Sequence, residues 1–146
     1  MPKIKLSGGA LLAPVPRVVV TTGSIGQPNV CTVGWGGMLS TKPPKTYVSL
    51  RPTRYSYELL QQNGEFVINL PTAALVRAID YCGVRSGRHE DKLAACHLIP
   101  QPASTVAPPL LAESPVSIEC RVEQVIPLGS HDMFLAEIVA VNVEED

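Results

Sequence analysis

Long apolar runs and secretion signals are missing from this sequence. No stretch approaches the roughly 20 apolar residues that a membrane-spanning helix needs. Residues 1–5, Met-Pro-Lys-Ile-Lys, lack the apolar segment and the cleavage site of a signal peptide. We therefore expect a cytoplasmic protein without membrane association. The length of 146 residues corresponds to one ordinary domain with one core, so residues 1–146 are expected to form a single domain.

Several familiar catalytic and metal-binding motifs are also absent. The four cysteines contain no CxxC pair, which argues against a disulfide framework and against a zinc or iron–sulfur site. No GxxxxGK, GxGxxG, GxSxG or HExxH pattern occurs, and the three histidines lie far apart in the sequence. The sequence therefore predicts no metal site, and it identifies no catalytic side chain.

The net charge is close to zero, but the charges are unevenly distributed. The formal charge is -1 and the pI is about 6.3. Residues 1–41 carry +3, residues 42–92 carry +3, and residues 93–146 carry -7. Four cations and no carboxylate occur between Lys42 and Arg54, and a second cationic cluster runs from Arg85 to Lys92. A nucleic-acid-binding protein usually has a broad basic face and a high pI, so we expect instead a local site for one small phosphate or carboxylate.

Short strand patterns dominate the chain. Alternating or β-branched segments predict strands at residues 17–22, 29–35, 46–50, 65–70, 116–126 and 134–143. Helices are expected from Ser56, as the cap, to residue 63, after Thr72, and at residues 91–96. Five prolines make residues 100–115 an extended connection. This order predicts a mainly β protein, a β-barrel with inserted helices, rather than regular βαβ alternation.

A strand followed by glycines covers residues 29–44. Small and hydroxyl-bearing residues surround the strand, and the glycines allow a ligand to approach the backbone closely. A flat heterocycle needs hydrogen-bond donors along its polar edge and small residues beneath its face, and this segment offers both. The residues leave a second interpretation open, in which a twisted barrel strand with a glycine bulge places Trp35 in the core.

The first anion-binding pattern covers residues 51–56, Arg-Pro-Thr-Arg-Tyr-Ser. The planar guanidinium of Arg51 can hold two phosphate oxygens, and Ser56 together with the free N–H groups of a helix N-terminus adds donors and a favourable dipole. These features predict a phosphate contact at this loop. A solvated loop with a serine cap remains the alternative.

The second anion-binding pattern covers residues 86–92, Ser-Gly-Arg-His-Glu-Asp-Lys. Gly87 permits a bend that turns backbone amides inward, and Arg88 and Lys92 would lie on one side, one turn apart, if the segment is helical. The alternative is a loop–helix junction with surface ion pairs. His131, in a tight connection between strands, is either a ligand contact or a turn residue.

Five sequence blocks in order resemble one known family. They are Arg17–Thr22, Pro28–Trp35, Ser40–Pro44, Gly64–Pro71 and Ser86–Lys92. Together they are similar to the flavin reductase-like, FMN-binding split-barrel proteins, and particularly to the flavoredoxin branch. The resemblance covers about residues 12–143, although the part after Glu119 matches more loosely.

The resemblance implies a homodimer of six-stranded split barrels, each of which holds FMN near the subunit interface. By position, the isoalloxazine and ribityl chain would be lined by Asn29, Cys31, Thr32, Trp35, Ser40, Thr41 and Lys42. The 5′-phosphate or lower ribityl chain would be held by Arg51, Ser56, Ser86, Gly87, Arg88 and Lys92. His131 would be a further contact. Among these residues, Thr32 is a candidate donor near N5 or the C4 carbonyl of the flavin.

The implied function is that of an FMN-binding oxidoreductase. It would pass electrons from NADH or NADPH to the flavin, and on to a protein or metal acceptor. Two alternatives stay open: a flavoredoxin-like carrier without direct nicotinamide activity, and a non-catalytic module that binds flavin or an anion. Relatives usually continue for several tens of residues past the strand that matches residues 134–143, so we expect that extension to be absent here.

Overall fold

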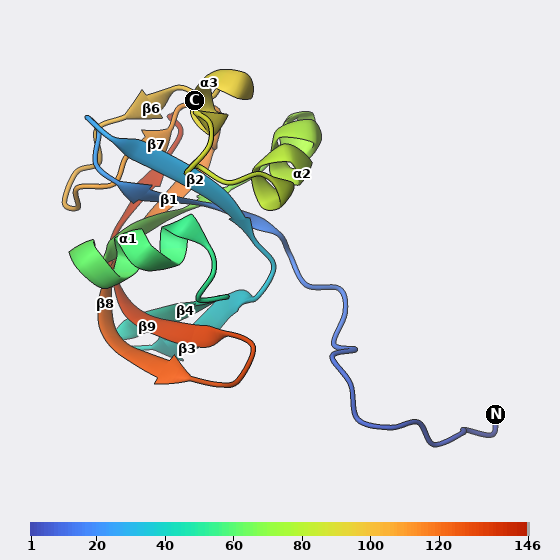
Figure 1. Cartoon of the computed structure of the whole chain (residues 1–146). Coiled ribbons are helices and arrows are strands. Elements are labelled where there is room, and N and C mark those ends of the chain that lie inside the picture. Colours follow the sequence, from blue (N-terminus) through green and yellow to red (C-terminus); the bar gives the residue numbers. More distant parts are fainter. Residues whose placement is uncertain (146) are drawn as a thin grey trace.

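One antiparallel sheet forms the centre of the protein, as Figure 1 shows for a computed structural model that describes residues 1–145. Its seven strands lie in the order β2-β1-β5-β8-β9-β4-β3. Their bounds are β1 Val18–Gly23, β2 Pro28–Val33, β3 Gly36–Thr41, β4 Pro44–Leu50, β5 Glu65–Leu70, β8 Val116–Pro127 and β9 Asp132–Val143. The strands at the two ends of this order, β2 and β3, are joined by only two residues, Gly34 and Trp35, so the sheet curls toward a barrel.

The helices gather around β1 and β2. They are α1 (Tyr55–Asn63), the single 3₁₀ turn η1 (Ala73–Leu75), α2 (Val76–Val84) and α3 (Lys92–Ala95). In Figure 1, α1 and α2 lie beside β1 and β2, which agrees with the contacts between these elements. A small second sheet pairs β6 (Pro100–Gln101) with β7 (Leu110–Leu111). None of the helices within residues 1–145 has the length and apolarity needed to cross a bilayer.

Alternation along β1 and β2 divides the buried side chains between two hydrophobic clusters. Val20 and Cys31 pack with Phe66 inside the barrel. Val19 and Val30 belong to the other cluster, which lies beneath α2 and α3. Because successive side chains of a strand point to opposite faces, this strand pair supports the barrel core with one face and the helical layer with the other.

The sequence-based fold prediction is confirmed in its main features. All six predicted strands are present, and β5 has the predicted bounds. Helix α1 ends where expected, at Gly64, which adopts a left-handed φ of 67° that glycine tolerates without strain. The proline-rich connection at residues 100–115 contains two two-residue strands and no helix. The result is a mainly β architecture with inserted helices.

Some local predictions are wrong. Residues 36–41 form the strand β3, whose pairing with β4 shifts register between Met38 and Ser40, so the sheet has seven strands rather than six. Arg54, not Ser56, occupies the N-cap position of α1, and Thr72 precedes only a 3₁₀ turn; neither position has a side-chain cap. Helix α3 begins at Lys92, so Arg88 lies outside it. The prediction that Arg88 and Lys92 share one helical side therefore fails.

Candidate functional site

A small cavity of about 120 Å³ opens at the N-terminal end of α1. Its walls come from β2, from residues 53–56 and from the connection between α2 and α3. The fold thus joins the two segments, 51–56 and 86–92, in which the sequence predicts an anion contact. The first N–H groups of a helix have no partner within the helix, and the helix dipole favours negative charge at this end. The cavity is consequently suited to an anion.

Lys92 is a buried cation in the wall of this cavity. The residue is 4% exposed, and its Nζ donates hydrogen bonds of 3.0 Å to the carbonyls of Cys82 and Arg85. An ammonium group has three N–H donors, so one remains for a ligand. Within residues 1–145, no carboxylate lies within ion-pair distance of Nζ. Burial lowers the pKa of Lys92, and a bound anion would offset the cost of keeping this charge in the protein.

Gly87 and Asn29 fix the opposite wall. The Asn29 Nδ2 donates to the hydroxyl of Ser56 at 2.8 Å and to that of Thr22 at 3.1 Å. A Cβ atom on Gly87 would lie 2.1 Å from Asn29 Oδ1 and 3.2 Å from Tyr55 Cδ1. Glycine is therefore required at position 87, because any side chain would displace the asparagine that positions Ser56.

A larger cavity of about 560 Å³ adjoins the small one. The two share Arg54 and Val84 as wall residues. Arg54 is held in place by a 2.8 Å hydrogen bond from its Nη1 to the carbonyl of Gly83. The larger cavity continues past α2 to Trp35 and His131, so a small anion site opens into a space of the size that holds small-molecule cofactors.

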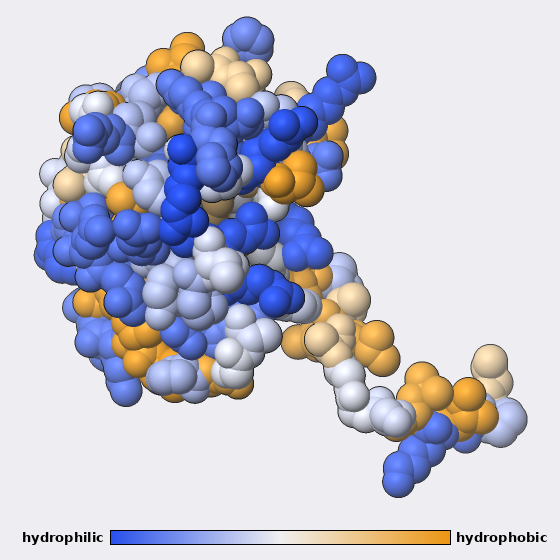
Figure 2. All heavy atoms as spheres, in the orientation of Figure 1, coloured by the Kyte–Doolittle hydropathy of each residue, from blue (hydrophilic) through white to orange (hydrophobic). Residues whose placement is uncertain are grey.

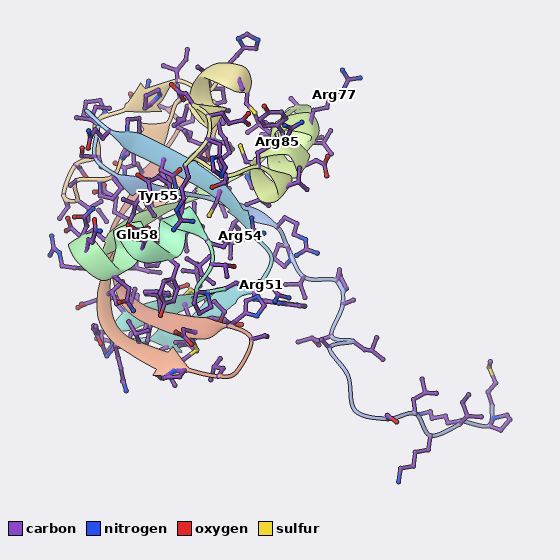
Figure 3. All side chains as sticks on the ribbon, in the orientation of Figure 1. Arg51, Arg54, Tyr55, Glu58, Arg77 and Arg85 are labelled. Atoms are coloured by element: carbon purple, nitrogen blue, oxygen red, sulfur yellow. The ribbon has the colours of Figure 1, made fainter. Side chains whose placement is uncertain are left out.

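Positive charge dominates the larger cavity. Arg17, Arg51 and Arg54 line it, against the single carboxylate of Asp80. Burial, followed by the charges of Arg51 and Arg54, lowers the pKa of His131, so its imidazole is neutral at pH 7. Figure 3 shows Arg51 and Arg54 on the same side of the molecule, near the start of α1. Figure 2 shows hydrophilic residues over the same region between α1 and α2.

Two β2 side chains that were predicted to contact a ligand are already committed to other interactions. The hydroxyl of Thr32 donates its single proton to the carbonyl of Ile79 in α2. In this arrangement Thr32 is not the free donor that the sequence suggested for N5 or C4. Cys31 is 3% exposed, and burial raises the pKa of its thiol despite the nearby Ser56, Lys92 and Arg54. Cys31 is therefore a neutral, packed side chain at the cavity floor.

The structure brings together ten of the fourteen residues predicted for the site. The small cavity is lined by Asn29, Cys31, Ser56, Ser86, Gly87 and Lys92. The larger cavity is lined by Thr32, Trp35, Arg51 and His131. Trp35 is 37% exposed, so it is not a core residue. Arg51 lies at the larger cavity rather than at the phosphate-sized one where the family resemblance places it.

Four predicted residues lie outside both cavities. Ser40, Thr41 and Lys42 occupy the far end of the β3–β4 hairpin, where Thr41 pairs with Pro44. Thr41 lies five positions along β3 from Gly36, which corresponds to roughly 17 Å in an extended strand. Arg88 lies on the surface, where it donates to Glu58 at 2.7 Å and to the carbonyl of Thr53 at 3.1 Å.

Sequence reasoning missed several wall residues. Arg17 lies over Gly34: a Cβ atom on that glycine would fall 1.6 Å from the Arg17 Nη1. In the sequence, nothing distinguishes Arg17 from an ordinary cation at the edge of a strand. Arg54 was recognised as part of a cationic cluster but not as a site residue. Its position at the N-cap of α1 became apparent only once the helix start was known. Asp80 and Val84 reach the larger cavity from α2, through a packing that no motif encodes.

Comparisons with known proteins identify the family. The sequence model of the flavin reductase like domain matches residues 11–146, so this chain belongs to the flavin reductase-like family. The structure of a flavoredoxin from Desulfovibrio vulgaris (Miyazaki F) is similar over 99% of this chain and 78% of that protein, with 36% identity and a TM-score of 0.90. The split-barrel architecture expected from the sequence is thereby confirmed.

Two further relatives bear on the ligand. An FMN-binding protein from Thermus thermophilus, solved with bound 1-cyclohex-2-enone, is 26% identical, with a TM-score of 0.83, over 98% of this chain and 80% of that protein. An FMN reductase (NADH) from Cronobacter sakazakii, RutF, is 26% identical over 135 residues, which are 89% of this chain and 75% of that protein.

Proposed function

We propose that this protein binds FMN and works in electron transfer, with the 5′-phosphate in the small cavity and the isoalloxazine in the larger one. The observation that carries the proposal is Lys92, a buried cation with a spare donor and no carboxylate partner among residues 1–145, beside the N-terminus of α1. A phosphate there would receive hydrogen bonds from Lys92 and from the first turn of the helix.

The residues around the larger cavity suit the flavin ring. Trp35 adds an apolar surface at one end, and the Arg17 guanidinium lies over Gly34, where it would face a ring system bound in the cavity. Bound FMN would supply the ability to accept and release a hydride or single electrons. Arg17, Arg51 and Arg54 would favour additional negative charge on a ligand here, because these three cations outnumber the single carboxylate of Asp80 in the lining. No side chain needs to act as an acid or base.

We propose NADH or NADPH as the electron source, and this finer statement rests on the name of the RutF relative. The second candidate is an electron carrier that holds FMN without direct nicotinamide activity. It is favoured by the 36% identity to a flavoredoxin. Anaerobic mixing of the FMN-loaded protein with NADH or NADPH separates the two, because only the reductase would quickly bleach the flavin absorbance band at roughly 450 nm.

We also propose that two copies of the chain associate through the β3–β4 face. Trp35, Met38, Leu39 and Leu128 are 37%, 62%, 44% and 61% exposed. A cavity of about 510 Å³ between Leu39, Leu128 and Met133 also touches Trp35 and His131, which line the flavin cavity. A second copy is the favoured occupant because this apolar surface continues directly into the proposed ring site.

Light scattering of the FMN-loaded protein should give a dimer, and Leu39→Glu should give a monomer with weaker flavin binding.

The direct test of flavin binding is a titration with FMN monitored by absorbance and fluorescence. We expect one FMN per chain. Lys92→Ala should weaken binding by about 1.5–3 kcal/mol, the range for a hydrogen bond to a charged group. Lys45→Ala is the matched control, because Lys45 forms only a surface ion pair of 2.8 Å with Glu123. Absence of a flavin spectrum after reconstitution would reject the function, and equal affinity in both variants would place the phosphate elsewhere.

A further inference from the structure

Two of the four cysteines, Cys82 and Cys96, lie against each other outside the two cavities of the candidate site. Both are free thiols, and their Sγ atoms are 3.9 Å apart. Cys82 belongs to α2, and Cys96 is the residue at which α3 ends. Both helices lie in the upper part of the view in Figure 1. Because an S–S bond measures about 2.05 Å, a small movement of α2 and α3 would allow these two thiols to form a disulfide.

The two thiols differ in their access to solvent. Cys82 is 0% exposed, and burial, followed by the neighbouring Cys96, raises the pKa of its thiol. Cys96 is only half-buried, and it lines a cavity of about 230 Å³ together with Arg77, Tyr81 and His97. Partly exposed surroundings with a nearby cation are typical of cysteines that react with oxidants. A small oxidant would therefore reach Cys96 first, while Cys82 stays shielded behind it.

A tight turn after α3 fixes the position of Cys96. His97 adopts a left-handed φ of 56°. The N–H of Leu98 donates to the carbonyl of Leu93 at 2.9 Å, which closes the C-terminal end of the helix. Leu93 and Leu98 are both buried in the hydrophobic cluster that contains Cys82. The backbone on either side of Cys96 is thus anchored, and it keeps this thiol against α2.

Lys92 is hydrogen-bonded to the main chain of both cysteines. Its Nζ donates to the carbonyl of Cys82 at 3.0 Å, and its own carbonyl accepts from the N–H of Cys96 at 3.0 Å. Lys92 is 4% exposed, so the surrounding atoms leave its side chain little room to follow a partner that moves. A change in the spacing of Cys82 and Cys96 would therefore displace the ammonium group in the wall of the small cavity.

We propose that Cys96 and Cys82 are an oxidation site for peroxide, and that their disulfide weakens the binding of a flavin phosphate by Lys92. In the first step the Cys96 sulfur attacks a peroxide oxygen. An S–O bond forms, the O–O bond breaks, the sulfur loses two electrons, and the departing hydroxide takes the thiol proton and leaves as water. In the second step the Cys82 sulfur attacks the sulfenic acid on Cys96. The S–S bond forms, the S–O bond breaks, and the released hydroxide takes the Cys82 proton, so two thiols and one hydrogen peroxide give one disulfide and two waters.

The effect on the flavin rests on the proposed function, because it requires the phosphate to lie beside Lys92. That function also supplies the oxidant, since oxygen that takes two electrons from a reduced flavin becomes hydrogen peroxide. Reduction of the disulfide by a dithiol would reverse the change. Thermodynamic linkage requires the opposite effect as well, so bound FMN would disfavour the disulfide by the same factor by which the disulfide weakens FMN binding.

Peptide mapping by mass spectrometry tests the oxidation site. After the purified protein is treated with hydrogen peroxide, we expect a disulfide between Cys82 and Cys96 that dithiothreitol reduces. Cys82→Ala should stop at the sulfenic acid on Cys96, which the reagent dimedone traps. Cys120→Ala is the matched control, because it removes a buried thiol of the barrel core and keeps the pair; it should form the same disulfide as the unmodified protein. No disulfide, or a different pairing, would overturn the proposal.

FMN titrations of the reduced and the oxidised protein, after removal of excess peroxide, test the consequence. The oxidised protein should bind FMN about fivefold or more weakly, and dithiothreitol should restore the affinity. Cys96→Ser keeps the main-chain bond to Lys92 but cannot form the disulfide, so peroxide should leave its FMN affinity unchanged.

Two results of these titrations would overturn the proposal. One is a disulfide between Cys82 and Cys96 that leaves the FMN affinity within about twofold. The other is an equal loss of affinity in peroxide-treated Cys96→Ser, which would assign the effect to another group. Absence of FMN binding in the reduced protein would instead reject the proposed function and, with it, the effect on the phosphate, while the mapped pairing would still decide whether Cys82 and Cys96 are an oxidation site.

Discussion

Two buried charges, Lys92 in the site and Glu119 in β8, have opposite surroundings. The carboxylate of Glu119 is 0% exposed and accepts hydrogen bonds from the backbone N–H groups of Ser104, Thr105 and Val106. The Ser104 hydroxyl and the Asn142 side chain also donate to it. Lys92, by contrast, has two carbonyl partners and a donor left over. Glu119 thus has its hydrogen-bond partners within the protein, whereas Lys92 has one N–H donor without a partner among residues 1–145.

The pKa values follow this difference. Burial alone would raise the pKa of Glu119, but the hydrogen bonds from Ser104, Asn142, Val106 and Thr105 outweigh it and lower the pKa to about 2. Burial lowers the pKa of Lys92, so the protein disfavours its charged form. A saturated buried charge stabilises the fold, whereas an incompletely paired one indicates a binding site. On this comparison the charge of Glu119 serves the fold, and that of Lys92 marks the candidate site.

The largest effect is expected from Glu119→Gln. The amide has one acceptor oxygen in place of two, and its NH₂ group would face N–H donors of residues 104–106. Unsatisfied buried donors cost about 1–3 kcal/mol each, so we expect a loss of about 3 kcal/mol or more in the free energy of unfolding. Urea denaturation at pH 7 measures it. Glu123→Gln, on the surface, should cost less than about 1 kcal/mol. Equal losses in the two variants would contradict the structural role of Glu119.

Lowering the pH should remove the stabilisation that the Glu119 carboxylate provides. Because the folded pKa of Glu119 is about 2 and its ordinary value is 4.5, the unfolded chain binds the proton more readily. The contribution of Glu119 to stability is complete above pH 4.5 and is lost as the pH falls from about 4.5 toward about 2. Over that range it amounts to on the order of 3 kcal/mol. Urea midpoints between pH 6 and pH 3 should fall more steeply in the unmodified protein than in Glu119→Gln, and parallel curves would refute the assignment.

The strands and helix ends that depend on neighbouring residues alone were predictable from the sequence. The β-branched run at Val18–Thr22 and the alternation in β8 and β9 specify strands without reference to distant residues, and Gly64 marks the end of α1. Strand β3 was missed because its glycines and its exposed Met38 and Leu39 weaken the usual strand signal. Its pairing with β4 is a tertiary effect that a sequence window does not contain.

The site was only partly predictable, for the same reason. The two cationic segments and the glycine at position 87 are visible in the sequence, and they do meet at one cavity. The roles of individual cations depend on where helices begin. Lys92 turns inward because α3 starts there, whereas Arg88, four residues earlier, stays on the surface with Glu58. Likewise, the β8–β9 ladder shifts register between Glu119 and Cys120, where β9 contains the extra residue Val139, and no local signal announces this shift.

Gly87→Ala tests the cavity wall that Gly87 and Asn29 form at the candidate site. Its new Cβ would lie 2.1 Å from Asn29 Oδ1, so the asparagine and its bond to Ser56 must shift. We expect a loss of about 1–3 kcal/mol in unfolding free energy, as for overpacking in a tight site, together with weaker FMN binding. Gly26→Ala is the control, because no atom lies within 4 Å of the Cβ position there. A stable variant with unaltered FMN affinity would show that the wall at Asn29 is unimportant.

The smallest change in stability is expected for Lys92→Met, the counterpart of Glu119→Gln. Methionine keeps the apolar stem and removes a charge that burial disfavours, but it also removes the hydrogen bonds to the carbonyls of Cys82 and Arg85. The two effects oppose each other, so the free energy of unfolding at pH 7 without flavin should change by less than about 1 kcal/mol. Because the pKa of Lys92 is lowered, the unmodified protein should also gain stability as the pH rises toward 10.5, and the variant should lack this gain. Alkaline urea titrations measure both quantities. A large loss without flavin would mean that Lys92, like Glu119, serves the fold rather than a ligand.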